Sequence, residues 1–138
     1  MKLSLVKDQE KIDFNIYKEG GLAGRSTASL AVGGSDDGLR PMEMFASSLA
    51  LCTSIDTLHI LNKQRVYLDY FEVNITAERV KNKVPAIFKE IILEFVIGEE
   101  EHLVKVAKAV NLSINKYCSV RHMIKDEVKI ETKIRLKT

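Results

Sequence analysis

The chain has 138 residues, of which 46% are hydrophobic and 29% charged, a composition that suits one domain with a sizeable core over residues 1–138. Its 21 basic and 19 acidic residues are interleaved, so no basic block could follow a phosphate backbone and nucleic-acid binding is not expected. We find no run of about 18 apolar residues, and charges follow the N-terminus too soon for a secretory signal. The sequence therefore predicts a cytoplasmic protein with no membrane partner.

The first part of the chain is expected to form β-structure. Residues 12–17 alternate between apolar and polar, which is typical of a half-buried strand. A glycine-rich turn is expected over 19–24, followed by a second strand over the small, β-prone residues 27–32. The turn-forming residues 33–38 then predict a loop.

A long helix is predicted from Pro41 to about residue 63. Proline suits the first helical position, where its missing N–H is not needed. Phe45, Leu49 and Cys52 recur at helical spacing, and many of the flanking residues are small, namely Ala46, Ser47, Ser48, Ala50, Thr53 and Ser54. A helix with these properties is expected to be buried on most sides. At about 1.5 Å per residue it would be some 35 Å long, which makes it the expected spine of the fold.

The second half of the chain returns to strands. Residues 71–78 and 90–97 alternate and predict an antiparallel pair. Acidic residues 99–101 suit the first turn of another helix, whose apolar stripe covers 103–114. A last strand is expected over 128–137. The order β-β-α-β-β-α-β lacks regular βαβ alternation, so the predicted fold class is α+β.

Two cysteines, Cys52 and Cys118, lie far apart in this sequence. A persistent structural disulfide is not expected in a cytoplasmic protein, where a cysteine pair more often indicates catalysis or metal binding. Cys52 lies about 16 Å from the start of its helix, too far for the helix dipole to activate it. A reactive Cys52 thus needs a cation, and arginine stays charged when partly buried. Arg25 can approach from another strand, whereas Arg40 would have to fold back along the helix.

A thiolate beside a cation could attack a peroxide, giving a sulfenic acid that a second thiol converts to a disulfide. In this hypothesis Cys118 is the second thiol, and apolar walls that include Phe45 favour bulky organic hydroperoxides.

Other interpretations of the same residues remain open. Cys52 suits a small core residue, because cysteine is among the most buried residue types. Cys52, Cys118, His59 and His122 are the right kinds of ligand for zinc, but no close pair such as CxxC is present. His59 lies on the Cys52 face of the helix, where it could be a base or an ordinary core or interface histidine.

Two motifs resemble those of the OsmC/Ohr family. The run PMEMFASSLALCTSID at 41–56 is similar to the first cysteine motif of that family, and KYCSV at 116–120 is similar to the second. The expected order of strands and helices matches over nearly the whole chain. The resemblance implies an OsmC-like fold, an intertwined homodimer with the long helices at its centre and active sites at the subunit interface.

The resemblance also implies an activity. Studied branches of the family are thiol-dependent peroxidases for organic hydroperoxides, in which Cys52 would be the peroxidatic residue and Cys118 the resolving one. Arg25 and Glu43 would hold the thiolate. Dihydrolipoyl groups or small dithiols would serve as reductants, and no metal or organic cofactor is implied.

The motifs depart from the hydroperoxide-resistance branch at two places. There, glutamate directly follows the proline; here Met42 stands in that position and Glu43 comes one residue later, about 100° further round the helix. Many relatives have proline after the second cysteine, where this chain has Ser119. The alternative function is therefore a non-enzymatic OsmC-like dimer that binds small molecules or senses stress or redox state.

Overall fold

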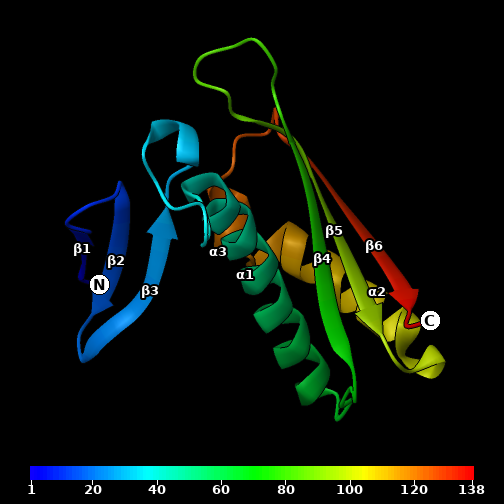
Figure 1. Cartoon of the computed structure of the whole chain (residues 1–138). Helices are drawn as coiled ribbons and strands as arrows, with labels where there is room; N and C mark the ends of the chain where they lie inside the picture. Colours follow the sequence, from blue (N-terminus) through cyan, green and yellow to red (C-terminus); the bar gives the residue numbers. More distant parts are fainter. The chain divides into compact units, whose positions relative to one another are not determined.

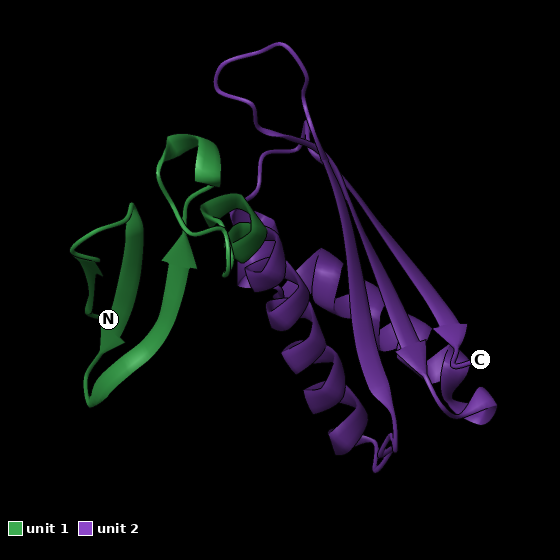
Figure 2. Cartoon of the chain, viewed as in Figure 1, with its two compact units in different colours: residues 1–45 green, residues 46–138 purple.

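A computed structural model describes all 138 residues of the chain. They form two compact units, residues 1–45 and 46–138, which Figure 2 shows in green and purple. Each unit contains one three-stranded sheet, and helices accompany the sheet of the second unit. The predicted α+β class is confirmed. The expectation of a single domain over the whole chain stays a prediction.

The first unit is an antiparallel sheet in the order β1 (Leu3–Lys7), β2 (Asp13–Lys18) and β3 (Gly21–Thr27), all blue in Figure 1. The prediction of a strand over 27–32 is wrong, because the chain reverses earlier than predicted and the strand is β3. Gly20 and Gly21 have φ of 101° and 131°, so the turn is tight and Gly21 already pairs with Lys18.

Two further differences concern this unit. The segment Leu30–Val32 is a single 3₁₀ turn rather than a strand. Strand β1 was not expected from the sequence, since its residues are all exposed and show no buried face. Its backbone pairs with β2 from Leu3 opposite Lys18 to Lys7 opposite Phe14.

Helix α1 (Pro41–Lys63) begins in the first unit and continues into the second, with the bounds that the sequence predicted. Its start is capped, because the Glu43 carboxylate accepts a hydrogen bond of 2.8 Å from the Arg40 backbone N–H. One face is buried, but Leu51 and Ile55 are 61% and 65% exposed. Burial on most sides is therefore wrong for the single chain.

The expectation that no segment could span a membrane also needs correction. By length and composition alone, α1 is apolar enough to cross one. The core helix of a soluble protein meets the same criterion, so this property by itself is weak evidence for a membrane location.

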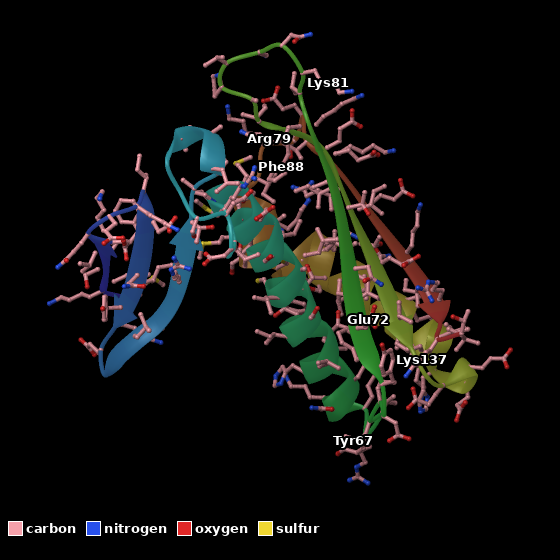
Figure 3. All side chains as sticks on the ribbon, in the orientation of Figure 1. Tyr67, Glu72, Arg79, Lys81, Phe88 and Lys137 are labelled. Atoms are coloured by element: carbon pink, nitrogen blue, oxygen red, sulfur yellow. The ribbon has the colours of Figure 1, made fainter.

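The sheet of the second unit has the order β4 (Phe71–Arg79), β5 (Phe88–Ile97) and β6 (Lys129–Leu136), as Figure 1 shows. The antiparallel pairing of β4 with β5 is confirmed, and β6 runs parallel to β5. In Figure 3, Tyr67 marks the loop before β4 and Lys81 the loop after it, at opposite ends of the sheet. The central strand β5 supplies fully buried side chains, namely Ile91, Leu93, Phe95 and Ile97.

The predicted second helix is present as α2 (Leu103–Leu112), preceded by a 3₁₀ turn at Glu100–His102. The chain then widens into one π-turn, Ser113–Tyr117, before the short helix α3 (Ser119–Met123). The Cys118 backbone N–H donates to Ser113 O at 2.8 Å, which closes the wide turn. Cys118 consequently lies at the junction between the π-turn and α3.

Candidate functional site

The fold brings the two cysteines of the sequence motifs together. Cys52 lies in the middle of α1 and is half-buried, whereas Cys118 is fully buried. Their sulfur atoms and a carboxylate oxygen of Asp56 all lie within 4.8 Å of one another. The site thus combines two thiols with one acidic group, all within the second unit.

Two uncharged groups lie within hydrogen-bond distance of the Cys118 sulfur. The Thr53 hydroxyl lies 3.5 Å from Sγ, and the Arg121 backbone N–H lies 3.4 Å from it. Burial raises the pKa of the Cys118 thiol and the neighbouring Cys52 adds to the rise, while these two hydrogen bonds offset only part of it. Cys118 is therefore held as a neutral thiol.

Asp56 is the residue of the cluster for which no role was predicted from the sequence. It follows Cys52 by four residues on α1, a spacing that places two side chains on the same helix face. The Ser113 hydroxyl donates to Asp56 Oδ2 at 2.9 Å, so the π-turn helps to orient the carboxylate. The signal was present in the CTSID motif, whose last residue is this aspartate.

Arg25 lies in the first unit, where it makes an ion-pair network. Its guanidinium donates to Asp37 Oδ1 at 2.6 Å and to Asp13 Oδ2 at 3.0 Å, and the Asp13 side chain is fully buried. The hydrogen bond to Asp37 raises the pKa of Arg25 further above its ordinary value. These contacts give Arg25 a structural role, and its role toward Cys52 stays a prediction.

Arg40 and Glu43 also have structural partners. Arg40 binds Asp36 through two hydrogen bonds, from Nε at 2.8 Å and Nη2 at 2.6 Å. Glu43 accepts from the Arg40 backbone and caps the first turn of α1. The catalytic role of Glu43 stays a prediction beside this capping role.

The histidines considered as zinc ligands are not part of the cysteine cluster. His122 Nδ1 lies 2.8 Å from the Cys118 carbonyl oxygen. His59 is exposed and borders a cavity of about 400 Å³. The cavity reaches the cluster through Asp56, and its other lining residues are Ile60, Lys63, Gln64, Leu112 and Tyr117.

A match to a protein-family model shows the family to which the chain belongs. The model of the family described as OsmC-like protein matches residues 34–133, which include both cysteines and Asp56. The chain belongs to the OsmC-like family. The resemblance seen in the two sequence motifs is thereby confirmed.

Individual relatives of this OsmC-like chain agree with that assignment. Protein YhfA of Escherichia coli K12 is 40% identical over 91 residues, which are 65% of this chain and 67% of that protein. A hypothetical protein from Aquifex aeolicus has a solved structure with a TM-score of 0.78 and 28% identity, covering 99% of this chain and 95% of that one.

A more distant structure is the organic hydroperoxide resistance protein OhrB of Bacillus subtilis. It is 17% identical, with a TM-score of 0.67, and covers 97% of this chain and 96% of that one. At this identity the likeness shows the fold alone. The predicted OsmC-like fold is therefore confirmed, and the two neighbouring cysteines are consistent with redox chemistry.

Proposed function

We propose that this OsmC-like protein is a cysteine-based, thiol-dependent peroxidase that reduces organic hydroperoxides. The observation that carries the proposal is the proximity of Cys52 and Cys118, whose sulfur atoms lie within 4.8 Å although the residues belong to distant segments. A hydroperoxide resistance protein of the same fold supports the substrate class.

The reaction has three steps. The Cys52 thiolate attacks the peroxide, so an S–O bond forms, the O–O bond breaks, and the alcohol leaves after taking a proton. The Cys118 sulfur then attacks the Cys52 sulfenic acid, which forms the disulfide and releases water. An external dithiol, such as a dihydrolipoyl group, restores both thiols by exchange and is itself oxidised to a disulfide.

Access to solvent supports the two assigned roles. Cys52 is half-buried and can meet a substrate, whereas Cys118 is 0% exposed and can meet only a sulfur already in the site. A disulfide requires the sulfurs to lie about 2.05 Å apart, so they must approach by less than about 3 Å. The junction between the π-turn and α3 offers one place for that movement.

The proposal includes Arg25 and Glu43 as the groups that stabilise the Cys52 thiolate. An arginine has five N–H donors, so Arg25 can share its guanidinium between Asp13, Asp37 and a thiolate. We further place the working enzyme in the cytoplasm as a homodimer. The exposed apolar side chains of Leu51 and Ile55 on α1 support a second copy as the partner.

Turnover of a model peroxide tests the proposal. The wild-type protein is expected to consume cumene or tert-butyl hydroperoxide with dithiothreitol or dihydrolipoamide. Cys52→Ser should abolish consumption. Without an external thiol, Cys118→Ser should still react once with the peroxide and accumulate the Cys52 sulfenic acid. Absence of turnover with every reductant, or full turnover by Cys52→Ser, would refute the peroxidase.

One observation favours the second candidate, a non-enzymatic OsmC-like dimer. The charged group beside the sulfurs is the carboxylate of Asp56, and a negative charge disfavours a thiolate. An activated Cys52 should react with iodoacetamide faster than a free cysteine at neutral pH, whereas in the non-enzymatic protein it should react more slowly.

A further inference from the structure

The cluster of Cys52, Asp56 and Cys118 contains ligands for a metal ion as well as a redox pair. We propose that the reduced cluster binds a thiophilic divalent cation, Zn²⁺, through the two sulfurs and the Asp56 carboxylate. Thiolates favour zinc among common divalent ions, and carboxylate oxygen also binds it. Three protein ligands leave a fourth position for water, as in zinc sites that remain open to solvent.

The distances within the cluster suit such an ion. With a Zn–S distance of about 2.3 Å, two sulfurs on one tetrahedral ion lie about 3.8 Å apart. All three candidate ligand atoms already lie within 4.8 Å of one another, so an inward shift of about 1 Å or less closes the site. Side-chain rotation of the half-buried Cys52 and Asp56 can supply this shift.

Neighbouring groups already orient two of the three ligands. Ser113 donates to Asp56 Oδ2 at 2.9 Å, which fixes the carboxylate and leaves it further lone pairs. Thr53 and the Arg121 N–H point at the Cys118 sulfur at 3.5 and 3.4 Å. Such outer hydrogen bonds are typical of metal sites, where they hold the ligands in place.

The charges of the cluster also favour a cation. Two thiolates and one carboxylate would carry three negative charges, and the donors to Cys118 are uncharged. A divalent ion offsets two of these charges and displaces the two thiol protons to solvent. The Asp56 carboxylate therefore adds a third anionic ligand to the two sulfurs.

Binding and oxidation exclude each other in this site. An ion held by Cys52 blocks that sulfur from attacking a peroxide, and a Cys52–Cys118 disulfide removes both thiolate ligands. We therefore expect zinc to inhibit peroxide turnover. This expectation rests on the proposed function, whereas the binding of zinc to the reduced cluster does not.

Cobalt and zinc titrations test the site. The full-length protein is reduced, freed of metal with a chelator and kept anaerobic, and Co²⁺ is added. We expect thiolate-to-cobalt charge-transfer absorption that reaches its plateau at one ion per chain and disappears when Zn²⁺ displaces the probe. Protein oxidised to the disulfide should show no such absorption.

Variants identify the ligands. Asp56→Asn should weaken zinc binding at least about tenfold and Ser113→Ala about ten- to a hundredfold, because loss of an orienting hydrogen bond alone has that effect. Asp126→Asn makes the same change at an exposed site outside the cluster and should leave the affinity unchanged. Circular dichroism checks the fold of each variant. If Asp56→Asn does not fold, the zinc affinity of Ser113→Ala is the deciding measurement.

Three results would each overturn the zinc site. The first is absence of the charge-transfer band, and the second is equal metal binding by the oxidised protein. The third is wild-type zinc affinity in folded Asp56→Asn; if that variant does not fold, wild-type affinity in Ser113→Ala counts instead. Peroxide turnover is measured separately in metal-free protein. Turnover without zinc binding refutes only the zinc site, and zinc binding without turnover refutes only the peroxidase.

Discussion

Asp56 is the residue that most changes the chemistry expected of the two cysteines. A cation was expected beside Cys52 from the sequence, whereas the group that lies beside both sulfurs in the second unit is the carboxylate of Asp56. The arginines considered for activation, Arg25 and Arg40, are each paired with aspartates of the first unit. An activating role of either arginine toward Cys52 therefore stays a prediction.

A buried aspartate of the first unit should make stability depend on pH. Burial of Asp13 opposes its ionisation, but hydrogen bonds from Ser35 and Ala28 and the charge of Arg25 outweigh it, so the pKa of Asp13 is lower than its ordinary 3.8. A carboxyl group with a lowered pKa in the folded state stabilises the protein above pH 3.8. That contribution is lost as the pH falls below 3.8 toward the folded-state value.

Urea unfolding of wild type and Asp13→Asn between pH 7 and pH 2.5 measures this effect. The variant should be less stable at pH 7, and the difference should shrink as the wild-type carboxyl becomes protonated. A difference that stays constant over the whole range would show that ionised Asp13 is not the cause.

At the scale of elements, the loop after the 3₁₀ turn is closed by backbone contacts. Gly33 has φ of 91°, and Gly34 N–H donates to Ser29 O at 3.0 Å. A Cβ built on Gly34 would lie 2.1 Å from the carbonyl oxygen of Ala28, too close for any side chain. The glycine is required here by a close approach of two backbone segments.

Gly34→Ala should therefore destabilise the first unit by at least about 2 kcal/mol, because the backbone must move to admit a methyl group. Gly24→Ala is the matched control, since a Cβ at that position meets no atom within 4 Å. The control should stay within about 0.5 kcal/mol of wild type in chemical unfolding. Equal stability of the two variants would contradict the close approach.

The elements that could be predicted from the sequence are those with a strong periodic pattern. Helix α1 was predicted with its bounds, and strand β5 alternates so regularly that its pairing with β4 followed. Strand β1 was missed because its residues are all exposed, and β3 because two glycines allow an unusually early reversal. In these cases the backbone pairing, rather than side-chain burial, determines the strand.

The candidate site was also predictable only in part, because it depends on contacts between segments that are distant in the sequence. Both cysteine motifs pointed to a Cys52–Cys118 pair, which the fold brings together. Asp56 lay within the first motif, but its hydrogen bond from Ser113 and its proximity to Cys118 depend on the π-turn at Ser113–Tyr117, which no local pattern indicated. Contacts between distant segments require the three-dimensional path of the chain.

At the scale of the whole molecule, the exposed apolar face of α1 should determine the oligomeric state. Ile55 is 65% exposed on a long apolar helix, and a second copy of the chain is the proposed cover. The wild-type protein should therefore sediment as a dimer of 15.6 kDa chains. Ile55→Glu should shift it to monomer, because a carboxylate buried at a symmetric interface is not paired.

Val104→Glu is the matched control for that dimer, since Val104 is 66% exposed on the helix α2. It introduces the same charge at equal exposure and should leave the dimer intact, as measured by analytical ultracentrifugation at several protein concentrations. A monomeric wild type, or equal dissociation by both variants, would mean that the α1 face is not the interface. Because the proposed active sites lie at that interface, Ile55→Glu should also lower peroxide turnover, whereas Val104→Glu should not.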